Sequence, residues 1–177
     1  GHSENLRVAR KMRDFAKRSD FKVHACGFNP YLNSKGKPNP HLTSPIKAER
    51  KLSISRIKRG LEHASEVSEP GKGVLMGPWY TRHEHLYTLR EGESNLLRDL
   101  LRDKIGPYAQ KLGVTAAFEP LRAHEQCLVM PGEEALDLAD RTGLKINGDT
   151  VHWGAQAEGQ LEDSLYKPLL NSVNGNK

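Results

Sequence analysis

The sequence predicts a single α+β domain over residues 1–177, in which about five helices pack on a short, mostly antiparallel sheet. Three observations predict this class. Apolar residues recur at helical spacing in some segments and alternate with polar residues in others. The tripeptide Asn147-Gly148-Asp149, between β-prone flanks, is a hairpin signal. No internal repeat and no low-complexity linker divides the chain.

Five segments have the apolar spacing of a helix: residues 5–18, 45–67, 94–105, 131–142 and 160–170. In the first, the residues expected to face the core are Leu6, Val8, Ala9, Met12, Phe15 and Ala16. In the second, the expected core stripe is Ile54, Ile57, Leu61 and Ala64. Gly106-Pro107 is expected to interrupt the third helix, which resumes for a turn or two before Gly113.

The expected strands are short: residues 21–28, 73–77, 79–89, 114–118, 121–130 and the hairpin 144–153. Residues 29–44 contain three prolines and predict a long flexible loop, because proline interrupts both ladders and helices. Residues 1–3 resemble the remnant of an expression tag, and residues 171–177 are expected to fray.

Composition favours a globular protein rather than a disordered one. Hydrophobic residues make up 36% of the chain and charged residues 28%. No apolar run reaches bilayer length and no secretion signal is recognisable, so no membrane partner is expected. Two cysteines, Cys26 and Cys127, do not make a disulfide framework, and a reducing, cytoplasmic location is expected.

Charge is distributed unevenly along the chain. Residues 1–60 hold 15 Lys and Arg against 4 Asp and Glu, whereas residues 61–177 hold 12 against 18. So many cations in one third of a domain attract polyanions, which predicts nucleic acid or another phosphate-rich ligand as the partner. The residues expected to hold its backbone are Lys47, Arg50, Lys51, Arg56, Lys58 and Arg59, with Arg82.

The segment 79–89 is expected to carry the polar chemistry. On a strand, His83 and His85 lie on one face beside aromatic rings, and an imidazole pair can transfer protons near neutral pH or bind a metal. His41, from the proline-rich loop, is expected to join them. His41-Leu42-Thr43 resembles the His-x-Thr element of the two-histidine phosphoesterases, but a second such element is missing, and no family is identified.

Metal and cysteine chemistry are weaker alternatives. His83 and His85 with His124 or Glu125 contain ligand types for a divalent metal, although no Cys-x2-Cys pair and no HExxH helix is present, and no metal ligands are assigned. Cys26, with His24 two residues before it and a further histidine as base, is a candidate nucleophile.

Together these features predict a nucleic-acid-binding protein, with phosphodiesterase or nuclease activity at His83, His85 and His41 as the specific hypothesis. One alternative is a non-enzymatic module whose acidic C-terminal portion binds a protein partner. The other is a cysteine-dependent enzyme that uses Cys26. Whether the chain is an enzyme at all stays open at this point.

Overall fold

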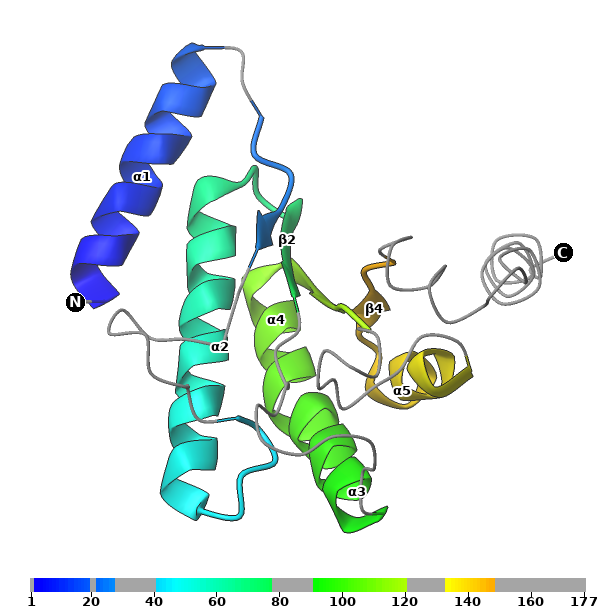
Figure 1. Ribbon diagram of the computed structural model, residues 1–177. Coiled ribbons are helices and arrows are strands. Elements are labelled where there is room, and N and C mark those ends of the chain that lie inside the picture. Colours follow the sequence, from blue (N-terminus) through cyan, green and yellow to red (C-terminus); the bar gives the residue numbers. More distant parts are fainter. Residues whose placement is uncertain (1, 20–21, 28–40, 78–90, 121–132, 149–177) are drawn as a thin grey trace, which may run out of the picture.

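The structure, a computed structural model, describes residues 2–19, 22–27, 41–77, 91–120 and 133–148 (Figure 1). Its helices are α1 (His2–Arg18), α2 (Lys47–Val67), α3 (Glu91–Leu100), α4 (Gly106–Leu112) and α5 (Glu133–Thr142), with a π-helical segment, η1 (Leu101–Ile105), joining α3 to α4. Its strands are β1 (Cys26–Gly27), β2 (Gly73–Gly77), β3 (Val114–Phe118) and β4 (Lys145–Ile146).

The four strands form one parallel sheet in the order β1-β2-β3-β4. Leu75, in the middle of β2, is paired with Cys26 on one side and with Ala116 on the other. Helices lie between successive strands in the chain, and they return it to the edge of the sheet from which each strand starts. The described part of the chain is therefore a run of parallel β/α units.

The predicted mostly antiparallel α+β domain is wrong. An apolar run such as residues 73–77 carries no direction of its own, and the alternation of strand and helix along the chain is what makes the pairing parallel. The expected hairpin also favoured the wrong, antiparallel pairing. Its first half contains β4, which pairs in parallel with β3, where Asn147 N–H also donates to the Phe118 carbonyl over 2.7 Å.

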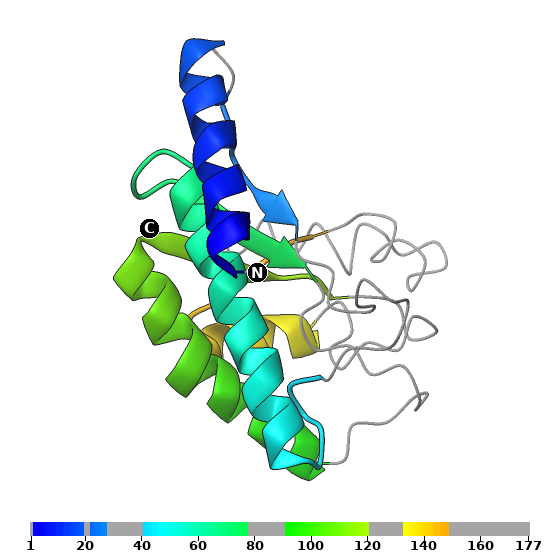
Figure 2. The ribbon, with the colours of Figure 1, turned by 90° about the vertical axis from the view of Figure 1, so that its left-hand side faces the viewer.

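The core lies between the sheet and the helices. In Figures 1 and 2, α2 and α4 lie side by side along the sheet. The residues that α2 buries recur at helical spacing: Ser53, Ile57, Leu61, Ala64 and Val67. Leu75 on β2 and Phe118 on β3 are 1% and 0% exposed and belong to the same cluster. Burying a side chain of this size contributes roughly 1.5–3 kcal/mol, so this layer holds the described units together.

The sequence predicted that the third helix is interrupted at Gly106-Pro107, and the structure shows that the helix continues there. Proline has no N–H to donate, and its ring collides with the carbonyl four residues earlier in a regular helix. The chain widens into η1 just before Pro107 and then continues as α4, so the helix passes the proline with a local π-helical segment. Leu101 and Ile105 of η1 are fully buried, which keeps this segment on the core.

Helix α1, which packs on α2, buries only part of the apolar set predicted to face the core. Ala9 and Ala16 are buried, whereas Val8, Met12 and Phe15 are 45%, 48% and 60% exposed. Small alanine side chains let the two helix backbones approach closely, and the larger apolar residues form a separate exposed stripe. Among the described helices, none has the length and apolar character needed to cross a membrane.

Candidate functional site

The carboxyl ends of β1 to β4 lie along one edge of the sheet, because all four strands are parallel. In parallel α/β folds, ligands bind where the chain leaves this edge. The described residues that follow the strands at this edge are Glu119 and Pro120 after β3, and Asn147 and Gly148 after β4. Glu119 is the ionisable residue among them, and the site is built around it.

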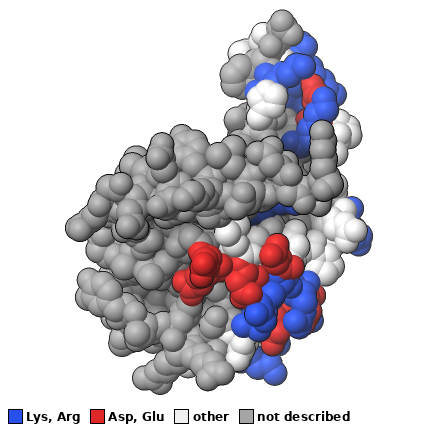
Figure 3. Space-filling view, turned by 90° about the vertical axis from the view of Figure 1, so that its right-hand side faces the viewer, with Lys and Arg blue, Asp and Glu red and all other residues white. Residues whose placement is uncertain are grey.

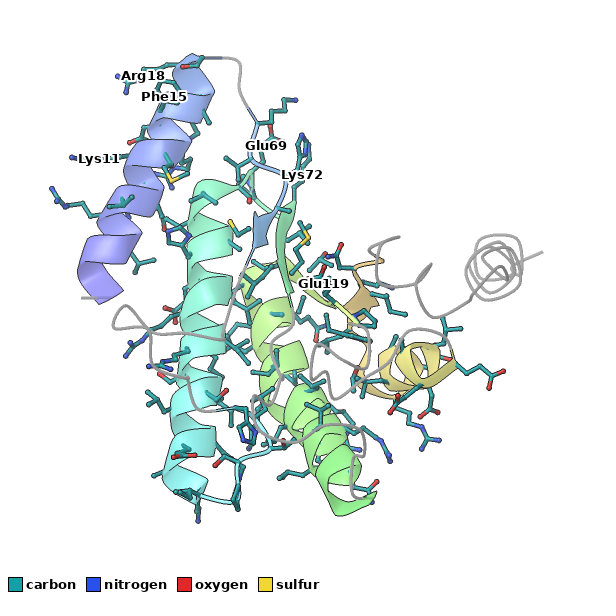
Figure 4. All side chains as sticks on the ribbon, in the orientation of Figure 1. Lys11, Phe15, Arg18, Glu69, Lys72 and Glu119 are labelled. Atoms are coloured by element: carbon teal, nitrogen blue, oxygen red, sulfur yellow. The ribbon has the colours of Figure 1, made fainter. Side chains whose placement is uncertain are left out.

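Backbone hydrogen bonds fix Glu119 at the centre of this edge. Its N–H donates to the Gly77 carbonyl, at the end of β2, over 3.2 Å. Phe118, just before it, is fully buried and accepts the hydrogen bond from Asn147. Pro120, just after it, is also fully buried. Glu119 itself is half-buried, and Figure 4 shows it at the opposite end of β2 from Glu69 and Lys72.

A half-buried carboxylate held on the ends of strands can accept a proton from a substrate or bind a cation. The two neighbouring strands fix the position of its backbone. A fixed position favours a catalytic role over that of a solvated surface residue. Glu119 was not singled out from the sequence. Its signal is that it is the first polar residue after the buried strand 114–118, which becomes informative only when the strand is known to be parallel.

The predicted catalytic pair lies outside the described residues. His83, His85 and Arg82 belong to the segment 78–90, which follows β2 in the chain. His124, Glu125 and Cys127 lie in the segment 121–132, after Glu119 and Pro120, and His152 follows β4. The proposed roles of His83 and His85 therefore stay predictions. Among the described residues, no group of three His, Cys, Asp or Glu side chains could hold a metal ion.

His41 is described, and its catalytic role stays a prediction. Its Nδ1 lies 3.1 Å from the Thr43 hydroxyl, and Leu42, Thr43 and Ser44 are buried in front of α2. Ser44 hydroxyl donates to Glu49 and accepts from the Ile46 N–H, which organises the start of the helix. The Thr43 hydroxyl that a His-x-Thr phosphate site would use is thus committed to its neighbour.

The basic residues of α2 do not form one phosphate-binding row. Arg50 donates to the carbonyls of Ser44 and Pro45 over 2.6 and 3.0 Å, and Lys58 lies 4.5 Å from the ring centre of Tyr108. Arg56 also interacts within the protein. Lys47, Lys51 and Arg59 are exposed. In Figure 3, cations lie on α1 at the top and, lower down, alternate with acidic side chains.

Cys26 is not an activated nucleophile. It lies in β1, half-buried, and this burial raises the pKa of its thiol. A reactive cysteine needs the opposite shift, because the thiolate is the attacking form. The raised pKa of its thiol gives no support to the prediction of a Cys26-dependent enzyme.

Comparison with known proteins agrees with the parallel β/α architecture. A family model described as xylose isomerase-like TIM barrel matches residues 3–175. Among curated protein sequences, none matches the chain. The family model overturns both the predicted antiparallel fold and the predicted nucleic-acid-binding nuclease, with its nucleic-acid partner.

Several solved structures similar to the chain are sugar epimerases. A D-psicose 3-epimerase crystallised in the presence of D-fructose has a TM-score of 0.71 at 17% identity, over 87% of this chain and 52% of that one. An L-ribulose 3-epimerase has a TM-score of 0.69 at 16% identity, over 83% of this chain and 47% of that one. A 3-keto-D-glucoside 4-epimerase from E. coli has a TM-score of 0.65 at 19% identity, over 93% of this chain and 64% of that one. The chain thus spans about half to two thirds of their length, and at these identities the likeness concerns the fold.

Proposed function

Because the chain belongs to the xylose isomerase-like TIM barrel family, we propose that it acts on a sugar as an isomerase or epimerase, with Glu119 at the reacting carbon. The observation that carries the proposal is the position of Glu119, at the carboxyl end of β3 and hydrogen-bonded to the end of β2. In barrels of this kind, catalytic residues come from the carboxyl ends of the strands.

The chemistry within reach of a carboxylate is proton transfer next to a carbonyl group. Glu119 would take the proton from the carbon beside the sugar carbonyl, which leaves an enediolate. A proton returned to the same carbon from the other face gives the epimer, and a proton returned to the former carbonyl carbon gives the isomer. Neither path changes the oxidation level of the sugar as a whole, so no external oxidant or reductant is consumed.

A second proton carrier is needed on the opposite face of the substrate for epimerisation. His83 and His85, which follow the end of β2 by six and eight residues in the sequence, remain the predicted candidates. A divalent metal, which the histidine content left as a weaker alternative, could take an oxygen ligand from Glu119. The cytoplasmic location expected from the sequence likewise stays a prediction.

The test is exchange of the proton beside the carbonyl in deuterium oxide, followed by NMR for D-fructose, D-psicose and L-ribulose. Glu119→Gln keeps the size of the side chain and removes the base, so the exchange and epimerisation rates should fall by about a hundredfold or more. Glu133→Gln, an exposed glutamate at the start of α5, is the matched control and should keep its activity.

Two results would contradict the proposal. Wild-type protein that exchanges no proton on any ketose or aldose offered would remove the sugar assignment. A Glu119→Gln variant as fast as wild type would keep the sugar but take Glu119 out of the chemistry. In the same assay, His83→Ala and His85→Ala test the predicted second proton carrier, and His41→Ala should have a small effect because His41 bonds to Thr43.

A further inference from the structure

A cavity lies at the end of the sheet opposite Glu119, between the carboxyl-terminal parts of α1 and α2. It has a volume of about 400 Å³, and its walls include Arg13 and Lys17 from α1, Lys22 after it, Ser65 from α2, and Ser68 and Glu69 beyond α2. Ser68 and Glu69 precede β2, whereas Glu119 lies beyond its carboxyl end, so the two sites are at opposite edges of the sheet (Figure 4).

Two of the residues that line this cavity each carry a buried polar atom without a hydrogen-bond partner. Among the described residues, the buried side-chain atoms that lack a partner are Nε of Arg13 and Oγ of Ser68. Ser68 is 4% exposed, so water in bulk does not solvate its hydroxyl. Leaving a buried donor unpaired costs on the order of 1–3 kcal/mol, and native proteins rarely tolerate it without a reason. Both atoms can donate, so the missing partner is a hydrogen-bond acceptor.

The charges around the cavity favour an acceptor that is also an anion. Arg13 donates from Nη1 to Glu66 over 2.7 Å, which orients the guanidinium, and its Nε forms an ion pair with Asp14 over 3.5 Å without making a hydrogen bond. Lys22 lies 3.8 Å from Glu69, which Lys72 already engages over 2.7 Å. Among the described side chains that line the cavity, three are cations (Arg13, Lys17 and Lys22) and one is a carboxylate (Glu69).

We propose that this cavity binds a small tetrahedral oxyanion, either inorganic phosphate or the phosphoryl group of a phosphorylated metabolite. Arg13 Nε and Ser68 Oγ donate to its oxygens, and Lys17 and Lys22 attract it. A guanidinium and a hydroxyl are common partners of phosphate oxygens. The carboxyl ends of α1 and α2 carry partial negative charge toward this end, so the affinity is expected to be modest.

The test compares sodium phosphate with sodium chloride at equal ionic strength, using backbone NMR shifts and thermal unfolding. Phosphate should shift the amide signals of residues 68 and 69 in a saturable way and raise the unfolding temperature, whereas chloride should do neither. Equal responses to the two salts, with no saturation, would overturn the proposal. A parallel titration with a sugar phosphate separates the sources: tighter binding than inorganic phosphate identifies a phosphorylated metabolite, and equal or weaker binding identifies the free ion.

Two variants test the donors. Ser68→Ala removes an unpaired buried hydroxyl, so in phosphate-free buffer it should be as stable as wild type or more so, while phosphate affinity falls roughly tenfold or more. Lys17→Gln, at an exposed position, should lower the affinity for phosphate several-fold without affecting the fold. Its matched control is Lys111→Gln, at an exposed position of α4, which should bind phosphate as wild type does. Unchanged affinity in both Ser68→Ala and Lys17→Gln would exclude this cavity as the phosphate site.

Discussion

The backbone carbonyl oxygen of Ala64 on α2 lies 3.0 Å from the position that a Cβ atom on Gly73 would occupy. Gly73 is the first residue of β2, so the start of this strand lies close to the backbone of α2. The neighbouring atom belongs to the helix backbone, which cannot rotate away as a long side chain can. Glycine is therefore required here for packing, not for an unusual backbone angle.

Gly73→Ala should push β2 away from α2 and destabilise the protein by about 1–3 kcal/mol, the usual cost of overpacking a core. Denaturant unfolding measures this directly. The control is Gly92→Ala, in a helix and with open space around the added methyl group, which should be neutral or stabilising by about 0.5–1 kcal/mol. Equal stability of Gly73→Ala and wild type would show that the strand and helix have room to separate.

Tyr108 should ionise at a higher pH than an ordinary tyrosine. Its hydroxyl donates to the carboxylate of Glu62, and this hydrogen bond, with some burial and the charge of Glu62, raises the pKa of Tyr108. The protonated phenol is the form that makes the bond. Its contribution to stability is therefore complete below the unfolded pKa of about 10 and is lost as the pH rises through the higher folded pKa.

An absorbance titration of the phenols checks this prediction. One tyrosine should ionise later than the others, and Tyr108→Phe should remove that last step while keeping the ring beside Lys58. Glu62→Gln should move the step to lower pH, because the neutral amide no longer opposes the phenolate. A Tyr108 that titrates together with the other tyrosines would show that the hydrogen bond to Glu62 does not persist in solution.

Cys26 should react slowly with iodoacetamide near neutral pH. Burial in β1 raises the pKa of its thiol, so a smaller fraction is thiolate than in free cysteine. Peptide mass spectrometry after timed alkylation follows Cys26 separately from Cys127. The rate should be several-fold below that of free cysteine in the native protein and should recover in denaturant. A native rate above that of free cysteine would contradict the assigned burial.

Short apolar runs were enough to locate the two central strands. Residues 73–77 and 114–118 were predicted as strands with the bounds that β2 and β3 have. Their direction was not in the runs themselves, since a buried strand has the same composition in parallel and antiparallel sheets. The helices predicted between them were the better signal, because a long helical crossover favours parallel pairing. The hairpin signal at Asn147-Gly148 outweighed it wrongly.

The faces of α1 show a second limit of apolar periodicity. Val8, Met12 and Phe15 form one helical stripe, and Ala9 and Ala16 form another, about a quarter of a turn away. The sequence predicted that both stripes face the core, whereas the structure buries only the small residues. Glu119 illustrates the same dependence on tertiary structure. Its position after an apolar run became meaningful only once the parallel sheet aligned the ends of β2, β3 and β4.

Glu66 should hold α1 on α2 mainly through Arg13. Its carboxylate accepts from Arg13 Nη1 over 2.7 Å and from Arg10 Nε over 3.1 Å, and the side chain of Arg13 is 33% exposed against 60% for Arg10. Exposed ion pairs contribute little, because water and salt screen them. The less exposed pair should therefore show the larger coupling.

Double-mutant cycles in phosphate-free buffer measure both couplings, with Glu66→Gln combined in turn with Arg13→Gln and Arg10→Gln. The Arg13 cycle should give a coupling of about 0.5–1 kcal/mol and the Arg10 cycle less than about 0.5 kcal/mol. In Glu66→Gln, the amides of α1 should exchange hydrogen faster than they do in wild type. The amides of α2 should keep their protection, because the lost contact is between the helices. A larger coupling for Arg10, or faster exchange spread evenly over α1 and α2, would assign the attachment of α1 to its buried alanines instead.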